Sequence, residues 1–296
     1  MRVAQSILLG LERTLTGIRR RIRSIRSTAK ITKAMEMIAA SKMRQAQLRV
    51  LAARPYSEKM REVLANLAAQ PRTEGDTHPL LQQREVKHMT VIHITADRGL
   101  CGGLNANVNR RTASFILEQH ISVNLVAVGR KGRDFMSRYG RDIRAEFTQL
   151  GDKPALVDTT PISRVVIDDY ANRLTDEIYL AYTEFITTAI QRPVLWKLLP
   201  IEPAKIRPIE NIDYIYEPSP SAVLGELLPR YVEMQVYHAI LESIASEQSA
   251  RMVAMRNATD NANEMIDDLT LTYNKARQEL ITKELLDIAG GIVTPT

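Results

Sequence analysis

From Arg230 to Ala289 the chain reads RYVEMQVYHAILESIASEQSARMVAMRNATDNANEMIDDLTLTYNKARQELITKELLDIA, 60 residues without a Gly or a Pro. A second stretch of this kind, 37 residues long, extends from Ile18 to Arg54. An ordinary helix has about 11–12 residues, so both stretches predict unusually long helices. A 60-residue helix would measure ~90 Å at ~1.5 Å per residue. We therefore expect a long antiparallel coiled coil of the two terminal helices, with a compact domain inserted at one end.

Apolar and small residues recur in steps of three and four along both stretches, which predicts coiled-coil seams. In the first stretch the seam extends from Leu8 to Ala53, and Glu36 interrupts it. We expect this helix to end at Arg54-Pro55, because the residue before a Pro is disfavoured in the α conformation. We expect the last helix to stop at Gly290-Gly291. The predicted seam of the last helix consists of Ala258, Ala262, Met265, Leu269, Thr272, Ala276, Glu279, Lys283 and Leu286.

The residues between the two stretches have a different pattern. Apolar runs at 86–95, 123–128, 143–147, 177–185 and 194–200 predict strands, and amphipathic segments between the runs predict helices. This alternation is typical of a small α/β domain with a mostly parallel sheet. The predicted fold class is therefore α+β overall, with an inserted α/β domain at one end of a two-helix coiled coil. The expected domains are 1–57, 58–222 (core about 85–200) and 223–296.

Charge is unevenly distributed along the chain. Residues 1–60 contain 14 Lys and Arg against three acids, whereas residues 230–289 contain six against ten. A basic helix can bind nucleic acid, an acidic membrane surface or an acidic partner helix, and this chain supplies such a helix. If the helix ends at Pro55 and Arg230 lie side by side, the residue numbers of neighbours across the antiparallel pair sum to about 285, and basic and acidic clusters face each other. The predicted pairing within the shaft involves Arg19, Arg20, Arg23, Asp260, Glu264 and Asp267.

The sequence contains no complete catalytic motif. DRGLCGGLN (Asp97–Asn105) follows a predicted strand and opens a helix, where α/β folds bind phosphate. It lacks GxGxxG spacing, and neither GxxxxGK[ST] nor GxSxG occurs. The five His show no metal-ligand spacing, and Cys101 has no second cysteine to pair with. We expect no catalytic residue, cofactor or metal. Two alternatives stay open: a coiled-coil arm of a nucleic-acid machine, and a nucleotide-binding α/β protein with helical arms.

Three segments resemble, in order and spacing, the gamma subunit family of the F-type ATP synthases. They are Ile18–Gln47, Asp97–Asn105 and Ala245–Ile288. The resemblance implies a non-catalytic central rotor shaft that couples rotation of a membrane ring to conformational change at catalytic sites on beta subunits. It implies one copy per complex. The implied partners are the alpha, beta and epsilon subunits and the c-ring, with membrane contact only through the c-ring and no nucleic acid.

The resemblance also implies contacts with the ring of alpha and beta subunits. The matching positions are Met35, Lys42, Arg251, Arg277, Gln278, Thr282 and Glu284. The chain departs from the family by starting about a dozen residues before the usual start near Ile18. It also lacks the paired-cysteine insert of chloroplast members, which favours a bacterial protein. The resemblance implies a proton-translocating enzyme and a peripheral position on the cytoplasmic side of the inner membrane.

Overall fold

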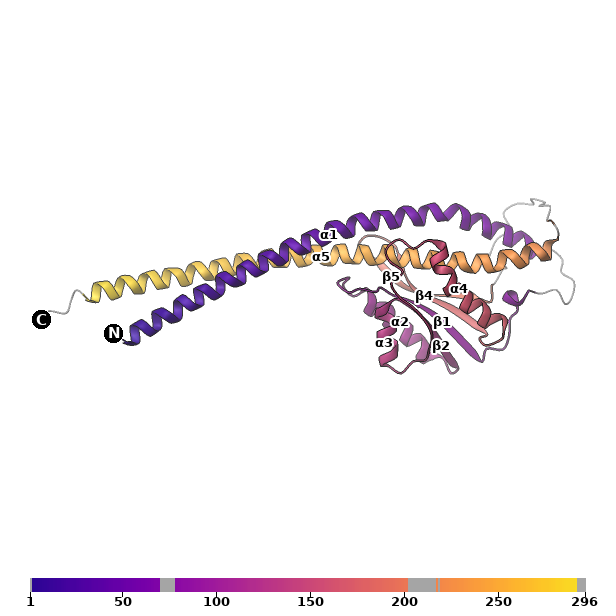
Figure 1. Cartoon of the computed structure of the whole chain (residues 1–296), viewed down its shortest axis with the longest axis horizontal. Helices are drawn as coiled ribbons and strands as arrows, with labels where there is room; N and C mark the ends of the chain where they lie inside the picture. Colours follow the sequence, from indigo (N-terminus) through magenta and orange to yellow (C-terminus); the bar gives the residue numbers. More distant parts are fainter. Residues whose placement is uncertain (1, 70–77, 202–216, 218, 292–296) are drawn as a thin grey trace. The chain divides into compact units, whose positions relative to one another are not determined.

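The structure of the chain is a computed structural model that describes residues 2–69, 78–201, 217 and 219–291. Two compact units are present. The coil unit comprises Met1–Ile38 with Met252–Thr296, and the sheet unit comprises Ala39–Arg251. Two long helices, α1 (Arg2–Ala69) and α5 (Pro220–Gly291), contribute to both units (Figure 1).

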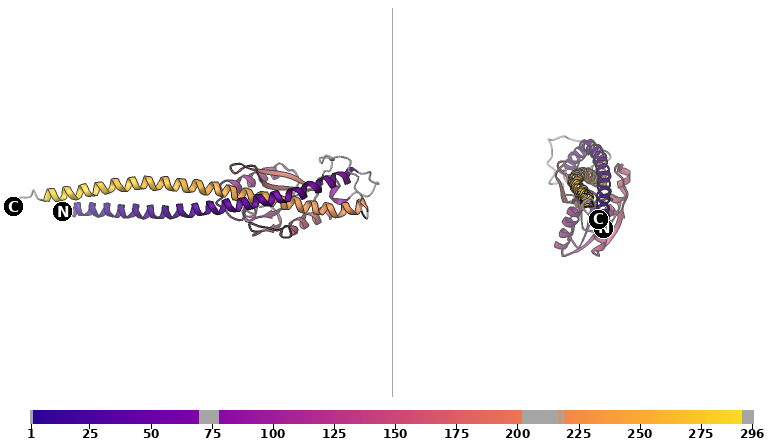
Figure 2. Two further views of the ribbon diagram at one scale, coloured as in Figure 1. Left: turned by 90° about the horizontal axis from the view of Figure 1, so that it is seen from above. Right: turned by 90° about the vertical axis from the view of Figure 1, so that its left-hand side faces the viewer.

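In the coil unit, α1 and α5 lie side by side as a two-helix coil (Figure 2). The seam of α1 includes Ala29, Thr32 and Glu36, all buried, and this confirms the seam predicted for the first helix, including its polar member. Small seam residues allow the two helix axes to approach closely. Half-buried side chains continue the seam on both helices: Leu15, Ile18, Ile22 and Ile25 on α1, and Ile266, Leu269, Tyr273, Ala276 and Leu280 on α5.

The seam of α5 differs from the prediction at six of its nine positions, and two of these six, Lys283 and Leu286, are exposed. Ala262, Leu269 and Ala276 belong to it as expected. The intervening positions are Thr259, Ile266, Tyr273 and Leu280 in place of Ala258, Met265, Thr272 and Glu279, and Met265 is 47% exposed. Ala262, Leu269 and Ala276 belong to both the predicted and the observed series of steps. The observed set covers the larger side chains of Ile266, Tyr273 and Leu280, which bury more apolar surface.

The inner ends of both helices extend beyond the predicted limits. α1 continues through Pro55 to Ala69, and α5 begins at Pro220 and contains Pro229. A Pro inside a helix costs ~3 kcal/mol. Burial on the far side of each Pro offsets this cost, because Met60 and Leu64 of α1 and Leu228 of α5 join the main core. The predicted domain limits at 57/58 and 222/223 fall inside these helices, and the division into domains stays a prediction.

The sheet unit is built on a five-stranded sheet with the order β3-β2-β1-β4-β5. Its strands are β1 (His88–Ile94), β2 (Ser122–Val128), β3 (Ile143–Phe147), β4 (Glu177–Phe185) and β5 (Gln191–Leu199). The first four are parallel, with Val91 of β1 opposite Leu125 of β2 and Tyr179 of β4. β5 pairs antiparallel with β4. This sheet confirms the predicted, mostly parallel α/β arrangement.

Helices cover both faces of the sheet. One face packs on α2 (Leu104–Glu118) and α3 (Arg130–Arg138), where Met89 and Val91 meet Ile116 and Met136. The other face packs on α4 (Leu156–Ala171) and α5, with Ile92 among the buried residues. Side chains alternate between faces along a strand, so neighbouring residues of β1 serve different cores. The short helix η1 (Pro79–Leu81) precedes β1.

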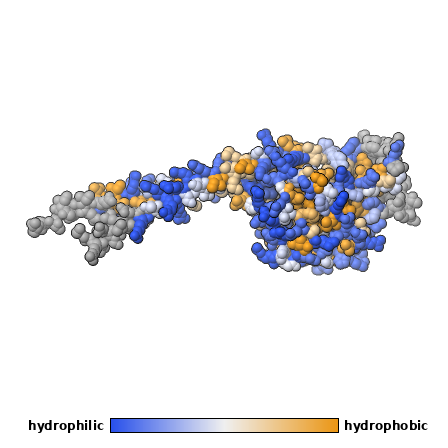
Figure 3. Space-filling view, viewed as in Figure 1, coloured by the Kyte–Doolittle hydropathy of each residue, from blue (hydrophilic) through white to orange (hydrophobic). Residues whose placement is uncertain are grey.

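On the face drawn in Figure 3, hydrophobic residues appear as small areas between hydrophilic ones. Across the residues that the structure describes, no helix combines the length and the apolar character needed to cross a membrane.

Candidate functional site

The loop DRGLCGGLN joins β1 to α2 at the carboxyl edge of the sheet. Gly102 has a φ of +58°, a backbone conformation that glycine adopts without steric cost. The two carboxylate oxygens of Asp97 accept the backbone N–H of Arg130 at 3.0 Å and that of Gln149 at 2.9 Å. Because those residues follow β2 and β3, Asp97 ties together the loops of three strands. The loop therefore has a structural role at this edge of the sheet.

Arg251 of α5 holds this loop from the helix side. Its Nη2 donates to the carbonyl oxygen of Gly99 at 3.2 Å and to Oε1 of Glu247 at 2.7 Å. The side chains of Arg251 and Glu247 are only 11% and 15% exposed. Burial raises the pKa of Glu247 and outweighs the opposing effect of Arg251. Arg251, predicted as a ring contact, is thus largely buried within the sheet unit and donates two hydrogen bonds there.

Lys42, a second predicted ring contact, is also engaged within the sheet unit. Its Nζ lies 2.6 Å from Oδ2 of Asp152, in the loop before α4. The other oxygen of Asp152 accepts from Nε2 of Gln248 at 3.0 Å. Asp152 therefore joins α1 to α5 through one carboxylate.

A polar layer interrupts the apolar seam of the coil unit. The hydroxyl oxygens of Thr32 and Thr259 lie 2.7 Å apart. One helical turn away, Nε of Arg256 donates to Glu36 at 3.1 Å and Nζ of Lys33 donates to it at 3.0 Å. The bond from Lys33, followed by that from Arg256, holds the pKa of Glu36 below its usual value. Polar residues in a coiled-coil seam specify register at some cost in stability.

These contacts correct the predicted register of the two helices. Thr32 faces Thr259 and Glu36 faces Arg256, so the paired numbers sum to 291 and 292 instead of about 285. Arg19 bonds to the hydroxyl of Tyr273, with its guanidinium 5.4 Å from the ring centroid. The predicted register was wrong because it was counted from helix ends at Pro55 and Arg230, and both helices extend further.

The predicted charge pairs within the shaft are consequently not formed. Within the described residues, no ion pair joins the three arginines to the three acids, and all six side chains are exposed: Arg19, Arg20, Arg23, Asp260, Glu264 and Asp267. Glu36 and Arg256 form the observed ion pair across the seam instead.

The other predicted ring contacts lie in the coil unit. Met35 is half-buried, whereas Arg277, Gln278 and Thr282 are exposed. The side chain of Glu284 lies outside the described residues. The sequence patterns did not reveal the roles of Glu247 and Asp152. The spacing of Glu247 and Arg251 by four residues on a helix could have indicated their pairing. No local pattern identifies the pair of Asp152 and Lys42, which lie far apart in the sequence.

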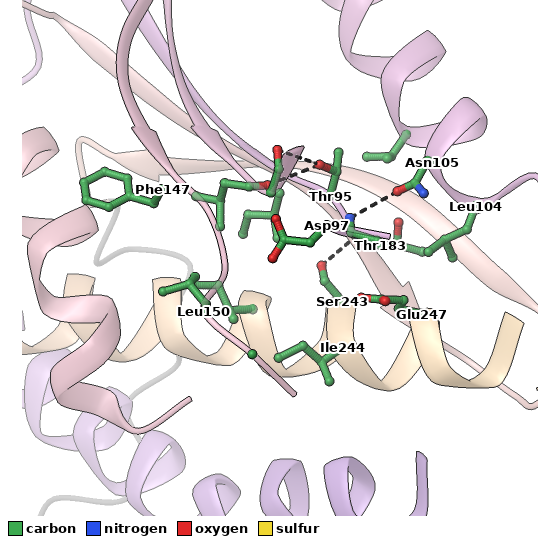
Figure 4. A pocket seen from close by; sticks show the side chains of 17 residues that line it. Thr95, Asp97, Leu104, Asn105, Phe147, Leu150, Thr183, Ser243, Ile244 and Glu247 are labelled. Atoms are coloured by element: carbon green, nitrogen blue, oxygen red, sulfur yellow. Dashed lines mark hydrogen bonds between the residues drawn. The ribbon is translucent and has the colours of Figure 1, made fainter. Parts of the chain in front are cut away.

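A small cavity of about 50 Å³ lies beside the loop, between the carboxyl edge of the sheet and α5 (Figure 4). Ligand pockets for small molecules typically measure ~300–1,000 Å³, so this cavity is too small for a nucleotide. Two of its polar side chains already bind backbone groups of the protein, since Asn105 accepts the N–H of Ala96 at 3.1 Å and Ser243 accepts that of Thr183 at 3.3 Å. Within the described residues, no group of three or more His, Cys, Asp and Glu side chains could hold a metal ion.

A two-helix coil unit and a small α/β sheet unit, whose cavity beside the carboxyl-edge loop is too small for a nucleotide, fit a stalk subunit, a class with a mechanical role. A family model described as ATP synthase matches residues 14–294. The chain belongs to the gamma chains of the F-type ATP synthases, the non-catalytic central-stalk subunits of these rotary enzymes.

The relatives match over most of their length. The ATP synthase gamma chain of Dehalococcoides mccartyi (strain BAV1) is 64% identical over 274 residues, covering 93% of this chain and 96% of the relative. That of Chloroflexus aurantiacus (strain J-10-fl) is 51% identical over 283 residues, covering 94% and 98%. A chain in the central stalk/c-ring structure of the Tetrahymena thermophila mitochondrial ATP synthase is 27% identical, with a TM-score of 0.60 and coverage of 77% and 99%.

Proposed function

We propose that the chain rotates as the central shaft of a bacterial, proton-driven F-type ATP synthase, within a ring of alpha and beta subunits. One copy per complex binds the epsilon subunit and the c-ring, and it sits peripherally on the cytoplasmic side of the inner membrane. The observation that carries this proposal is a coil unit with a packed seam and an outer surface of exposed side chains, Arg277 and Gln278 among them. The Tetrahymena relative, described with a central stalk and c-ring, supports the c-ring as a partner.

The mechanism follows from the asymmetry of a two-helix shaft. A shaft that presents different faces to three otherwise equal catalytic sites makes them unequal at each moment. Each orientation then biases the open–closed equilibrium of one site, and linkage requires that nucleotide binding also biases the orientation. Rotation driven by the membrane ring thus releases ATP, and ATP hydrolysis can turn the shaft in reverse.

We propose ring contacts at Met35, Lys42, Arg251, Arg277, Gln278, Thr282 and Glu284. Arg277 and Gln278 are the most direct candidates, because both side chains are exposed and, in the described part of α5, neither is committed to a hydrogen bond. The hydroxyl of Thr282 already donates to the backbone carbonyl oxygen of Gln278 at 2.9 Å. Lys42 and Arg251 would contribute mainly through the loops that they hold.

The test is assembly with alpha and beta subunits from the same organism. We expect the pure chain to show no ATP turnover and the co-purified complex to hydrolyse Mg-ATP. The double substitution Arg277→Ala/Gln278→Ala should leave the thermal unfolding of the chain unchanged and reduce assembly or ATPase activity. Asn274→Ala/Lys275→Ala, equally exposed, is the matched control. Failure of the unmodified chain to co-purify with alpha and beta would reject the proposal.

A further inference from the structure

Strand β4 extends beyond its parallel neighbour. The pairing of β1 with β4 ends at His93 and Ala181, whereas β4 continues to Phe185 and stays paired with β5 up to Gln191. Backbone groups of β4 beyond Ala181 therefore lack a strand on the β1 side. Buried backbone N–H and C=O groups need partners from elsewhere.

Helix α5 supplies these partners from one face. The N–H of Thr183 donates to Oγ of Ser243 at 3.3 Å, and its carbonyl oxygen accepts from Oγ of Ser246 at 3.1 Å. The N–H of Phe185 donates to Oε2 of Glu242 at 3.0 Å. Figure 4 shows Ser243 on α5 directed at Thr183. Three side chains of a helix thus replace the missing strand.

The same helix face also binds the turn after β4. Oγ of Ser249 donates to the carbonyl oxygen of Thr188 at 2.8 Å. We call the four helix residues the polar row: Glu242, Ser243, Ser246 and Ser249. Their spacing of one, three and three residues places them on one side of α5. All four are buried, and Ser246 and Ser249 are fully so.

The polar row differs physically from the apolar contacts around it. Ile240 and Ile244 of α5 also pack in the core, but the hydrophobic effect has no direction. Such contacts hold a helix through the shape of the interdigitated side chains and not through bond directions. Hydrogen bonds weaken steeply with misalignment, so rotation of α5 about its axis would break all four bonds together.

We propose that the polar row is the contact through which torque passes between the sheet and α5. The inference rests on the proposed rotor function, because only a rotating shaft loads this contact. α5 continues from Ser249 to Gly291 as one helix, so torque applied to it at the polar row acts along the same helix.

The test compares variants in the complete ATP synthase. Ser243→Ala/Ser246→Ala removes both bonds to Thr183. Glu242→Met removes the acceptor at similar length, whereas Glu242→Gln keeps an amide oxygen for the N–H of Phe185. Ser221→Ala, an exposed serine near the start of α5, is the control. The measurements are protons pumped per ATP hydrolysed in inverted membrane vesicles, and hydrogen exchange of the Thr183 and Phe185 amides.

We expect the double variant and Glu242→Met to speed exchange at these amides at least tenfold. Protons pumped per ATP should fall at least twofold, while the ATPase rate falls less. Glu242→Gln and the control should match the unmodified enzyme. Faster exchange with unchanged pumping would overturn the inference. So would a loss of assembly by both the double variant and the milder Ser249→Ala, since the row would then serve folding alone. If the unmodified chain does not assemble, the proposed function fails instead.

Discussion

The hydroxyl oxygens of Thr32 and Thr259 lie 2.7 Å apart across the seam of the coil unit, and this contact fixes which turns of the two helices face each other. In a Cys101→Ser background, the pair Thr32→Cys/Thr259→Cys should form a disulfide under mild oxidation in the assembled complex. Two Oγ atoms at this distance occupy nearly the places that the two sulfur atoms of a disulfide would take, so a small shift closes the bond. The measurement is the shift of the gamma band on a non-reducing gel.

The control pair follows the register that helix ends at Pro55 and Arg230 would give. Ile22→Cys/Ala262→Cys would cross-link if paired numbers summed to about 285, but the observed contacts displace these residues by about two helical turns. We expect no disulfide there. Cross-linking of the control pair in preference to Thr32 and Thr259 would contradict the observed register.

The sequence predicted most of the sheet unit because its signals are local. Alternation of short apolar runs with amphipathic segments located all five strands, and for β1 the run at 86–95 matches His88–Ile94. Which residues of α5 form its seam was harder to predict, because Ala262, Leu269 and Ala276 fit two different series of three- and four-residue steps. Only the partner helix decides between these series, through contacts such as Thr32 with Thr259.

The helix limits and the site contacts could not be predicted for a similar reason. Pro55 is a strong local stop signal, and the burial of Met60 and Leu64 that overrides it depends on the tertiary core. The links from Lys42 to Asp152 and from Arg251 to Gly99 span more than 100 residues. No spacing rule in a single sequence encodes contacts of this length.

Gly129 should be the least replaceable glycine of the sheet unit. Its φ is +93°, and a Cβ at this position would overlap the carbonyl oxygen of Thr95. Gly129→Ala should therefore lower the free energy of unfolding by about 3 kcal/mol or more, from backbone strain and overlap together. The measurement is urea unfolding followed by the fluorescence of Trp196, the one tryptophan, which lies in β5.

Two other glycines serve as graded controls. Gly102 has a φ of +58°, and a Cβ added there would meet no atom within 4 Å, so Gly102→Ala should cost only the strain, ~1–2 kcal/mol. Gly99 has neither a positive φ nor a close neighbour, and Gly99→Ala should stay within ~0.5 kcal/mol. Equal effects at all three positions would refute this explanation.

His93 should make the sheet unit less stable in mild acid. It is fully buried, with Nε2 donating to Asn109 at 2.8 Å and Nδ1 accepting from Thr112 at 3.1 Å. Burial lowers its pKa to about 4 from the ordinary 6.5. Between these values the unfolded chain binds the proton more readily, so stability is lost as pH falls from about 6.5 toward 4.

The expected loss from this group between pH 7.5 and pH 5 is about 2 kcal/mol, given ~1.36 kcal/mol per pKa unit. Urea unfolding of the sheet unit, followed by Trp196 fluorescence at the two pH values, measures it. His93→Gln should be less stable at pH 7.5 but lose correspondingly less on acidification. The same pH dependence in the variant and the unmodified chain would assign the effect to other groups.

Arg251 should control access to Cys101 through the loop that it holds. Cys101 is buried, and burial followed by the charge of Glu247 raises the pKa of its thiol. Arg251→Ala removes the bond to Gly99 and leaves Glu247 without its cation, and hydrogen bonds to charged groups contribute ~1.5–3 kcal/mol. If that energy restrains local opening, the rate of alkylation of Cys101 at pH 8 should rise about tenfold or more.

Arg256→Ala is the matched control, because it removes an arginine of α5 that pairs with Glu36 in the coil unit. Its alkylation rate should equal that of the unmodified chain. The same assay separates two explanations for any loss of ATPase activity in Arg251→Ala. If ATPase activity is lost and Cys101 is alkylated faster, Arg251 acts by positioning the loop. Loss with an unchanged alkylation rate means that Arg251 contacts the alpha and beta ring directly, and the positioning role inferred from its bond to Gly99 is then wrong.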